Sequence, residues 1–488
     1  MIQVIVLAGG LGEKLWPLSR QRMPKQFLKL IDNEKSLFQI TINRFIELKK
    51  QINEEELNLI IVCNENNKYL VKQQTDEIIK SDIDSYTIIA EPINKKTTTA
   101  IAVALEFTKY NDNILVIPSD QVWDDFEFCQ CVKSLVSLKN NGISLIGIKP
   151  YYPATRFGYI NSKDNKLISF KEKPDIESAL EYINNKDPIY LWNTGVLYFK
   201  KKVMIDDLTN KYNKLLLDVK NIVNNSESIN NIITLNQEDY ESIEEISIDN
   251  SVLENYENGY VLEYKNYWND IDNFKSLFDY LPKDKDFNLI QSLNDNVLTI
   301  NTSNSFIHSA HKLVTTIGIS DLVIIDTRDS LLVAEKNSSL NVNEMVNLLK
   351  SRSRSEHVVN PVCYKPWGWY IDLEGSDYSG HKVKKICVYP NQRLSLQSHK
   401  DRSEHWTIVK GKAKVQIGED THNLETNKSI YIPKGVLHRI ENIGEENIEF
   451  IEIQIGAYLG EDDIIRYHDD FGRKISKNNL SSLVTEDF

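Results

Sequence analysis

The 488-residue sequence has no apolar run of about 18 residues, the length at which a membrane-spanning helix becomes a candidate. It also has no excess of basic residues, since 57 lysines and arginines stand against 70 aspartates and glutamates, a net charge of −13. Phosphate backbones are bound by basic surfaces, so this balance argues against a nucleic-acid-binding protein. Any phosphate site must be local and use a few cations. We therefore expect neither a membrane nor a nucleic acid as partner.

Cysteine is scarce, with five residues that are scattered and odd in number. This pattern fits free thiols rather than a disulfide framework, and Cys129 with Cys131 lacks nearby partners for a zinc site. The N-terminus has no charged segment ahead of its first apolar run, unlike a signal peptide. We expect a protein of the reducing cytoplasm.

The first half of the chain alternates short apolar runs with helical stretches. Continuous apolar runs are typical of strands buried on both faces of a parallel sheet. The repeated strand–helix–strand order predicts a doubly wound α/β domain, followed by a more mixed region at residues 161–282. The apolar runs are residues 3–7, 58–63, 87–90, 113–117 and 143–148, and the helical stretches are residues 39–49, 68–80 and 98–110.

Two β-rich regions follow. Residues 298–334 are short β-rich pieces separated by turn residues, which predicts a small β module, with a few solenoid coils as one interpretation. A short helix at 342–350 and a polar linker at 351–356 come next. Residues 366–456 are almost wholly short strands, which predicts a sandwich or barrel of jelly-roll type. We divide the chain into domains at residues 1–290, 291–355 and 356–488.

The first apolar run ends in a glycine turn, Leu7-Ala8-Gly9-Gly10-Leu11-Gly12. Glycines after a buried strand let backbone N–H groups approach a phosphate. The turn is not a Walker A loop, because no Gly-Lys-Ser/Thr follows, and not a dinucleotide fingerprint, because Leu15 stands at the third glycine position. A tight strand-to-helix turn without a ligand is the alternative.

Three cations, Lys14, Arg20 and Lys25, follow the glycines closely. Triphosphate and phosphosugar groups need such clamps, and arginine can bind them bidentately. Asp120 ends another predicted strand, at the sheet edge where open α/β proteins bind ligands. It can hold Mg²⁺ or, alternatively, cap a helix.

Further motifs occur in order over most of residues 1–282. They are Leu7-Ala8-Gly9-Gly10, Leu15-Trp16-Pro17-Leu18-Ser19-Arg20, Pro24-Lys25-Gln26-Phe27, Glu91-Pro92, Pro118-Ser119-Asp120, Phe157-Gly158-Tyr159-Ile160, Phe170-Lys171-Glu172-Lys173-Pro174-Asp175, Trp192-Asn193-Thr194-Gly195, Ser247-Ile248-Asp249 and Trp268-Asn269-Asp270. Together they resemble the sugar nucleotidyltransferase family in its mannose-1-phosphate guanylyltransferase form.

The resemblance implies a role for each motif. The glycine loop and Lys25 would cradle the phosphates of GTP, helped by Arg20, with Lys14 as a third cation. Lys173 would meet the phosphate of mannose-1-phosphate. The reaction would be in-line attack of the sugar phosphate on the α-phosphorus of GTP, with release of pyrophosphate. The remaining implied residues are Gly9, Gly10 and Gly12 for the nucleotide, Glu172, Asn193 and Gly195 for the sugar, and Asp120 and Asp270 for Mg²⁺.

Several positions depart from the family's pattern. They leave three interpretations: slower activity, an altered base or sugar preference, or a decayed transferase. The departures are Glu13-Lys14 for Thr-Arg, Lys95-Lys96-Thr97 for Arg-Asn-Thr, Gln121 for His, and Asp272 and Phe274 for Gly and Trp.

The C-terminal region holds four residues that can bind a metal, Gln397, His399, Glu404 and His438. Residues two apart on a strand face the same way, so Gln397 and His399 share a face. Two histidines, a carboxylate and an amide can hold a divalent transition metal such as Zn²⁺, Co²⁺ or Mn²⁺ with positions left open. Histidines with a purely structural role are the alternative.

These residues belong to two motifs that look like a cupin, and a wider set resembles the type II phosphomannose isomerase domain. The matching segments are Lys365-Pro366-Trp367-Gly368, Leu394-Ser395-Leu396-Gln397-Ser398-His399, Arg402-Ser403-Glu404-His405-Trp406, Tyr431-Ile432-Pro433, His438-Arg439, Glu441-Asn442 and Tyr458-Leu459-Gly460-Glu461-Asp462-Asp463-Ile464. The resemblance makes the four residues metal ligands and implies Arg402 and Arg439 as cations for a sugar phosphate. The reaction would be proton transfer between C1 and C2, with Glu461 and His405 as candidate bases.

The combined expectation is a two-headed enzyme of GDP-mannose supply. It would act on GTP, mannose-1-phosphate, mannose-6-phosphate and fructose-6-phosphate, and it would form a homodimer. The alternatives are a guanylyltransferase with a structural cupin, an isomerase alone, and a sugar-nucleotide-binding protein with a dead transferase head.

Overall fold

A computed structural model describes the whole chain except residues 11, 53–56, 80–85, 139–140, 293–294 and 471–488. The chain divides into two compact units, Met1–Val359 and Asn360–Phe488. Leu11 of the glycine turn, Lys80 of a predicted helix and the end of the predicted third domain lie outside the described residues. The three-way division at residues 290 and 355 stays a prediction.

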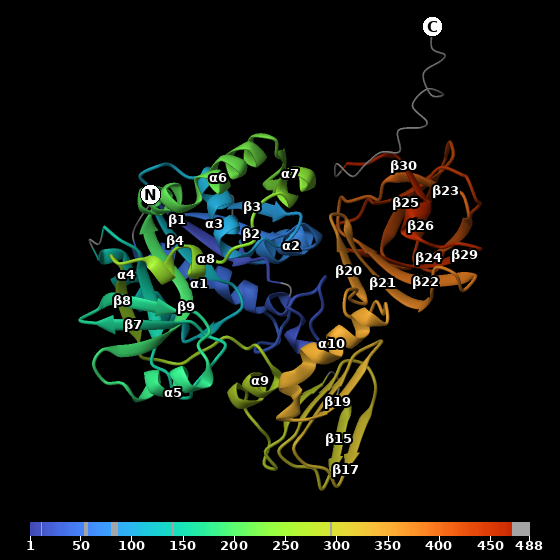
Figure 1. Ribbon diagram of the computed structural model, residues 1–488. Coiled ribbons are helices and arrows are strands. Elements are labelled where there is room, and N and C mark those ends of the chain that lie inside the picture. The colour runs from blue at the N-terminus through green and yellow to red at the C-terminus, as the bar shows by residue number, and fades with distance from the viewer. Residues whose placement is uncertain (11, 53–56, 80–85, 139–140, 293–294, 471–488) are drawn as a thin grey trace. The chain divides into compact units, whose positions relative to one another are not determined.

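Unit 1 is built on an 11-stranded sheet (Figure 1) in the order β10-β11-β3-β2-β1-β4-β9-β6-β12-β8-β7. The strands β3, β2, β1 and β4 are parallel neighbours and are buried on both faces, as their continuous apolar sequences predict. The bounds are β1 Ile2–Ala8, β2 Leu57–Asn64, β3 Tyr86–Glu91, β4 Asn113–Pro118, β6 Ser144–Ile148, β7 Tyr159–Lys163, β8 Lys166–Lys171, β9 Ile189–Lys200, β10 Glu227–Ile229, β11 Ile232–Thr234 and β12 Tyr260–Tyr264.

The helices form two packed groups, α1 with α2 and α4, and α3 with α6 and α8. Together they cover the sheet, so the predicted doubly wound α/β fold is confirmed. The sheet is not purely parallel, since β9 runs antiparallel between β4 and β6, and the pairings of β10, β8 and β7 at the two edges are antiparallel as well. The helix bounds are α1 Leu37–Ile52, α2 Lys68–Ile78, α3 Lys96–Glu106, α4 Asp125–Ser137, α5 Ile176–Asn184, α6 Lys201–Asn224, α7 Gln237–Glu241, α8 Ile248–Ser251 and α9 Phe274–Tyr280.

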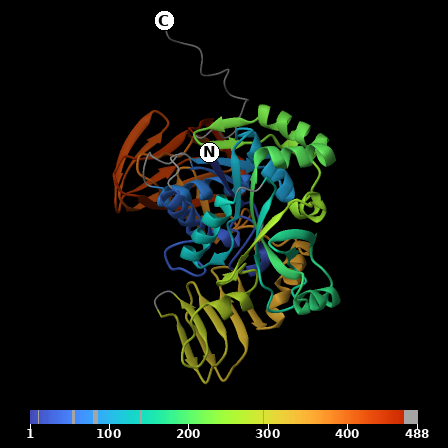
Figure 2. The same cartoon turned by 90° about the vertical axis from the view of Figure 1, so that its left-hand side faces the viewer.

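The β module is a short β-helix. Leu289, Phe306 and Val323 stack in register at intervals of 17 residues, and Val297 and Val314 repeat the same interval on a second face. Figure 2 shows these strands side by side. The predicted solenoid coils are therefore present. The strands are β14 Leu289–Ser292, β15 Val297–Ile300, β16 Phe306–Ser309, β17 Val314–Ile317, β18 Leu322–Asp326 and the antiparallel β19 Leu331–Glu335, followed by α10 Val342–Ser351.

The β-helix shares its apolar core with the transferase loops. Leu15 and Trp16 from the glycine-loop region pack in one cluster with Phe274 of α9, Phe306 of the β-helix and Val346 of α10. Segments about 330 residues apart in sequence are thus buried together, which makes them one cooperative body.

Unit 2 is a two-sheet barrel, which confirms the predicted jelly-roll type. Its core contains Trp406, Phe450 and Ile386. One sheet has the order β20-β21-β22-β29-β24-β27 and the other β26-β25-β28-β23-β30. The bounds are β20 Val362–Lys365, β21 Gly368–Gly375, β22 His381–Val388, β23 Leu396–His399, β24 Arg402–Lys410, β25 Lys412–Ile417, β26 Asp420–Glu425, β27 Ser429–Ile432, β28 His438–Asn442, β29 Ile448–Gly456 and β30 Ile464–His468.

Candidate active sites

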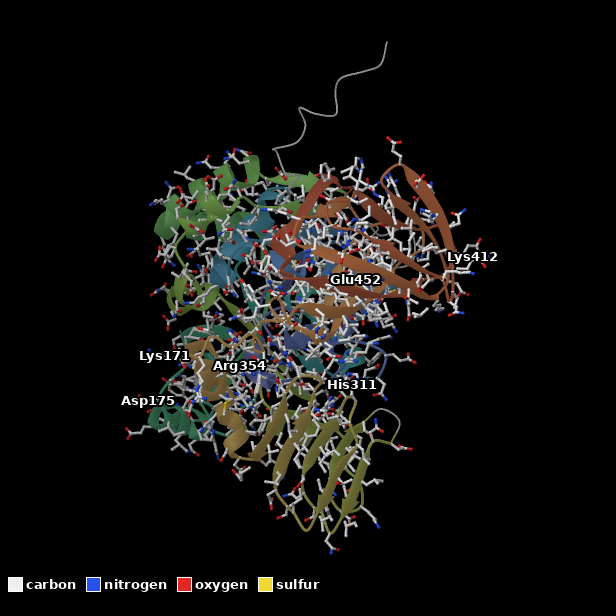
Figure 3. All side chains as sticks on the ribbon, turned by 90° about the vertical axis from the view of Figure 1, so that its right-hand side faces the viewer. Lys171, Asp175, His311, Arg354, Lys412 and Glu452 are labelled. Carbon is white, nitrogen blue, oxygen red and sulfur yellow. The ribbon has the colours of Figure 1, made fainter. Side chains whose placement is uncertain are left out.

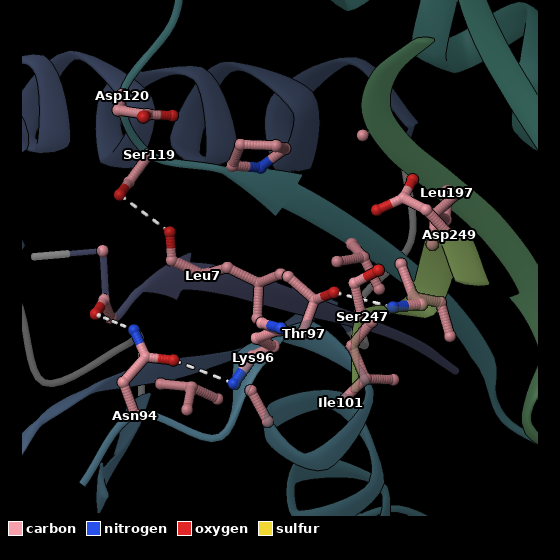
Figure 4. Close-up of a pocket in the computed structure, with 18 of the residues that line it drawn as sticks. Leu7, Asn94, Lys96, Thr97, Ile101, Ser119, Asp120, Leu197, Ser247 and Asp249 are labelled. Carbon is pink, nitrogen blue, oxygen red and sulfur yellow. Dashed lines mark hydrogen bonds between the residues drawn. The ribbon is translucent and has the colours of Figure 1, made fainter. Parts of the chain in front are cut away.

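A cavity of about 610 Å³ opens in unit 1 where the parallel strands β1 and β4 end. This is the edge at which open α/β sheets bind ligands. Figure 4 shows Asp120 and Ser119 at one side of the cavity and Asp249 and Ser247 at the other. The predicted site residues that line it are Gly9, Gly10, Asp120, Glu172, Lys173, Asn193 and Gly195.

Hydrogen bonds to its carbonyl groups hold the glycine turn in place, and Gly9 and Gly10 of this turn line the cavity. The Gln26 amide donates to the carbonyls of Ala8 and Gly10 at 2.9 and 3.1 Å. A Cβ on Gly9 would lie 3.2 Å from a carboxylate oxygen of Glu91, so a side chain there would crowd the cavity floor. Position 12 requires glycine, because its φ is +62° and a Cβ atom there would lie only 2.6 Å from the backbone nitrogen of Lys25. Among the described residues, Gly12 is not part of the cavity lining.

The opposite side of the cavity is rich in oxygen and amide groups. The Asn193 amide donates to Asp249 at 3.0 Å and accepts from the Gly195 N–H at 3.1 Å, so both of its ends are fixed. Burial and the neighbouring Glu172 raise the pKa of Asp249 to about 6. Lys173 is exposed and lies 2.9 Å from Glu172, in the segment between Lys171 and Asp175, two residues whose side chains Figure 3 labels. These groups can bind sugar hydroxyls and one anionic group.

Lys25 links the two predicted magnesium ligands. Its Nζ lies 3.1 Å from Asp120 Oδ2 and donates to the carbonyl of Asp270 at 2.6 Å. Burial opposes its charge, but Asp120, Asp270 and Asp272 outweigh burial and raise the pKa of Lys25. Burial and the Asp272 carboxylate raise the pKa of Asp270 to about 6. This surplus of carboxylate oxygens suits a hard divalent cation, so Asp120 and Asp270 could hold one.

Arg20 does not lie where the resemblance implied. It is 1% exposed, and its guanidinium nitrogens donate to both carboxylate oxygens of Asp329 and to the carbonyl of Val359. The donors of Arg20 are thus occupied within the fold, and its role toward GTP stays a prediction. Lys14 is 53% exposed and lies 3.6 Å from Asp272. Neither of these two described cations lines the cavity.

Three of the departures from the family's pattern are accommodated by internal contacts. Gln121 is buried, donates to the Thr194 carbonyl at 2.7 Å and accepts from the Trp268 indole at 3.2 Å. Lys95 donates to the carbonyl of Glu241 at 2.8 Å. Asp272 is hydrogen-bonded by Arg156, a residue that the sequence analysis did not single out. In contrast to these, Lys96 lines the cavity.

Glu91 is the most informative residue that the sequence analysis missed as a site residue. It is buried at the cavity floor and accepts a hydrogen bond from the hydroxyl of Tyr240. Burial raises the pKa of Glu91 to about 7. Its motif, Glu91-Pro92, could have drawn attention to it, but no spacing rule marks its chemistry. Other lining residues missed in this way are Asn94, Thr97, Ser247, Asp249 and Asn250.

In unit 2, His399, Glu404 and His438 come together from β23, β24 and β28. Their ligand atoms lie within 4.8 Å of one another, and the three side chains are 2%, 1% and 1% exposed. Within the described part of the chain it is the one such group of three or more His, Cys, Asp or Glu residues. The predicted ligands are thus assembled by strands that are distant in sequence.

The protonation states of this cluster suit a metal. His399 Nε2 lies 3.1 Å from Glu404, but this nitrogen and His438 Nε2 have no hydrogen-bond partner among the described residues. The side chains of His399, Glu404 and His438 therefore point toward a common position, and the two Nε2 atoms make no hydrogen bond within the cluster. Burial lowers the pKa of His438, whose Nδ1 is 2.9 Å from the Val436 carbonyl. A hydrogen bond there fixes the tautomer that leaves Nε2 free for a metal.

The fourth predicted ligand, Gln397, is buried and pairs in register with His438 across the strands. Its side-chain oxygen accepts from the Ser395 hydroxyl at 3.0 Å. Gln397 thus lies next to His438, and its role as a metal ligand stays a prediction.

Two cations of unit 2 have different positions from those implied. Arg402 is 2% exposed and donates to Glu404 at 3.1 Å and to the Gly460 carbonyl at 2.9 Å, so it orients Glu404, and its role toward a sugar phosphate stays a prediction. Arg439 follows the inward-facing His438 on β28, faces the other way, and contacts His468. Lys384, on the inner face of β22, is the cation that the sequence analysis missed.

Of the two candidate bases, His405 is exposed and packs on Tyr431, away from the cluster. Glu461 lies 2.6 Å from Lys384 Nζ. Although burial opposes it, Lys384 holds the pKa of Glu461 at about 2, which makes it a weak base while this pair is intact.

A buried carboxyl stands behind the metal ligand. Glu452 of β29 (Figure 3) and Glu404 are bridged by the Trp406 indole, which is 3.0 and 3.1 Å from them. Burial and the Glu404 charge raise the pKa of Glu452 to about 8. Glu404 is thus held in place by neutral groups as well as by Arg402.

Comparisons with known proteins assign three family domains to this chain. The nucleotidyl transferase family matches residues 3–286, a MannoseP isomerase/GMP-like beta-helix domain matches residues 295–349, and a mannose-6-phosphate isomerase C-terminal domain matches residues 352–469. The chain is 35% identical to a mannose-1-phosphate guanylyltransferase of Salmonella montevideo, over 97% of this chain and 100% of that protein. It is 34% identical to the alginate biosynthesis protein AlgA of Pseudomonas fluorescens, over 99% of each chain.

A solved structure, described as a mannose-1-phosphate geranyltransferase from Thermus thermophilus, is similar with a TM-score of 0.59 and 25% identity. The match covers 72% of this chain and 99% of that one. None of the described helices combines the length and apolarity needed to cross a membrane.

We predict that Glu404→Gln abolishes metal binding by unit 2. Loss of outer-shell partners already costs about 10–100-fold in metal affinity, so loss of a charged ligand should exceed about 100-fold. Metal content after dialysis, measured by plasma mass spectrometry, should fall from one ion per chain to near zero. Glu449→Gln, a carboxylate on β29 that pairs with Lys385, is the control and should keep the metal. Retention of metal by the Glu404 variant would contradict the assignment.

Proposed function

Since the chain belongs to the mannose-1-phosphate guanylyltransferase family, with its nucleotidyl transferase and mannose-6-phosphate isomerase domains, we propose that it catalyses two reactions of GDP-mannose supply. Unit 1 makes GDP-mannose and pyrophosphate from GTP and mannose-1-phosphate. Unit 2 interconverts fructose-6-phosphate and mannose-6-phosphate. The observation that carries the proposal is the presence of both sites in one chain: a cavity between a glycine turn and polar sugar-side groups, and a buried His-Glu-His cluster.

In the transferase, the chain's residues bind and orient two anions. Gly9 and Gly10 offer room for a phosphate against the backbone, and Lys173 offers a charge for the sugar phosphate. Lys25 stands beside Asp120 to offset negative charge that grows on the transferring group. We propose that Asp120 and Asp270 hold Mg²⁺, which would supply further charge stabilisation.

In the isomerase, we propose that Gln397, His399, Glu404 and His438 hold a transition metal such as Zn²⁺, Co²⁺ or Mn²⁺, which would act as a Lewis acid toward the sugar oxygens. Lys384 binds the substrate phosphate, and Glu461 occupies its place when substrate is absent. Displacement of Glu461 from this ion pair raises its basicity, so that it can move the proton between C1 and C2.

We place both reactions in the cytoplasm, a proposal supported by five free cysteines. The homodimer stays a prediction. An isomerase-only or binding-only protein is less well supported, because Gln121, Lys95 and Asp272 pair inside the fold and leave most of the cavity lining as the family's motifs predict.

The direct test mixes full-length protein with GTP, Mg²⁺ and mannose-1-phosphate and measures pyrophosphate and GDP-mannose together. The same preparation, loaded with a transition metal, is assayed for mannose-6-phosphate formed from fructose-6-phosphate. We expect both activities. Absence of the first with the second intact would leave an isomerase with a changed or dead transferase, and the reverse would leave a structural barrel.

We predict that Glu91 selects guanine and makes GTP binding pH-dependent. Guanine offers two adjacent N–H donors, which need the ionised carboxylate as acceptor. Because the pKa of Glu91 is raised to about 7, the ionised fraction grows through neutral pH, so KM for GTP should fall as pH rises. Glu91→Gln should raise KM for GTP about 10–100-fold, the loss expected for a hydrogen bond to a charged group, and flatten the pH profile.

Tyr240→Phe is the matched control. The hydroxyl of Tyr240 favours the ionised carboxylate, so its removal should shift the KM profile to higher pH without flattening it. An unchanged KM and pH profile in the Glu91 variant would refute the assignment.

We predict that Lys384→Met raises KM for fructose-6-phosphate about 10–100-fold, since it removes a charged hydrogen bond to phosphate. Lys385→Met is the control, because Lys385 alternates to the other face of β22 and pairs with Glu449. Equal effects of the two variants on steady-state kinetics would argue against a phosphate site at Lys384. The metal content of each variant reports whether unit 2 is folded, because the His-Glu-His cluster assembles only in the folded barrel.

A further inference from the structure

The segment that carries the transferase cations is linked to the β-helix by an ion pair whose cation, Arg20, is buried. We call residues 12–27 the cation loop. Arg20, inside this loop, donates from its two terminal nitrogens to the two carboxylate oxygens of Asp329, at 2.6 and 2.5 Å. Asp329 lies in the turn between β18 and β19, 309 residues further along the chain. A bidentate pair of this kind fixes both position and orientation.

A second element binds the same loop. Residues 356–359, the last of unit 1, accept hydrogen bonds from it: the Trp16 indole donates to Glu356 at 3.0 Å, and the backbone N–H groups of Gln21 and Arg22 donate to His357 and Val358 at 3.1 Å each. Arg20 itself donates to the Val359 carbonyl at 2.9 Å. The cation loop is therefore clamped on both sides of Arg20.

Backbone hydrogen bonds connect Arg20 to the part of the cation loop that carries Lys25. Arg20 and Met23 exchange two hydrogen bonds, at 2.9 and 3.0 Å, so the position of one fixes that of the other. Gly12 leaves no room for a Cβ against Pro24 and the Lys25 nitrogen, so the two ends of the loop are tightly packed. Lys25 then reaches Asp120, and its Nζ position depends on a loop anchored by Arg20.

We propose that Asp329 of the β-helix is a positioning residue for nucleotidyl transfer, which acts through Arg20 to hold Lys25 against the nucleotide phosphates. The inference rests on the proposed guanylyltransferase function. It gives the β-helix a part in the chemistry of unit 1, although Asp329 lies outside the cavity lining among the described residues. The charge of the pair is needed, because the Arg20 guanidinium is buried and an uncompensated buried cation would move.

The test compares Asp329→Asn with wild type in the full-length chain. Asparagine keeps the shape of the side chain and removes its charge. We expect KM for GTP to rise about 10-fold or more, as for loss of a bidentate charged pair, with KM for mannose-1-phosphate changed less than about twofold. Asp329→Glu should restore part of the GTP affinity. Isomerase activity, which belongs to unit 2, should be unchanged, and the nearly unchanged KM for mannose-1-phosphate reports that unit 1 is folded.

A double-mutant cycle separates positioning from a general loss of stability. If Asp329 acts through Arg20, the Arg20→Gln variant and the double variant Arg20→Gln with Asp329→Asn should have the same KM for GTP, within about twofold. Asp321→Asn, in an earlier turn of the β-helix, is the control and should leave KM unchanged. Additive effects of the two substitutions, or an unchanged KM for GTP in Asp329→Asn, would overturn the inference.

GTP binding by calorimetry distinguishes failure of this inference from failure of the proposed function. A wild-type protein without turnover would refute the function. Weaker GTP binding by Asp329→Asn would then still support the positioning role, and equal binding would refute it.

Discussion

A cation that is buried in a protein needs a counter-charge, and both sites of this chain are arranged by that constraint. Arg20, Lys25, Lys384 and Arg402 are all buried, and each contacts a carboxylate: Asp329, Asp120, Glu461 and Glu404 respectively. An enzyme for anionic substrates needs cations in low-dielectric surroundings, where they bind phosphate strongly. Each carboxylate offsets the charge of the cation that it contacts. The positions of the carboxylates therefore decide which cations can meet a substrate.

This constraint also explains which parts of the site could be predicted from the sequence. Strand ends and motif order were sufficient to predict Gly9, Gly10, Asp120, Lys173 and Asn193, and all five line the cavity. The direction of Arg20 could not be predicted, because it depends on Asp329, which the chain brings back only through the β-helix. Motif membership places a residue on a loop, whereas its long-range partner decides which way its side chain faces.

The fold, like the site, has parts that could be predicted from the sequence and parts that could not. Continuous apolar strands and jelly-roll spacing were sufficient to predict the α/β domain and the barrel, since burial on both faces or on one face leaves a local pattern. The 17-residue β-helix register appears only when Leu289, Phe306 and Val323 are stacked, because its turns contain ordinary polar residues. In the barrel, the alternation of faces separates Lys384 from Lys385 and His438 from Arg439, so adjacent residues of one strand have different surroundings.

Two departures from the family's pattern lie together in the structure, and their contact bears on whether the transferase head has decayed. Asp272 is buried, hydrogen-bonded by Arg156 and 3.6 Å from Lys14. An isolated buried carboxylate beside Asp270 would cost about 3–5 kcal/mol, the loss measured when one partner of a buried pair is removed. The chain instead places two cations around the added negative charge. The charge balance around Lys25 and Asp270 is thereby kept, so the added carboxylate does not by itself argue for a decayed transferase.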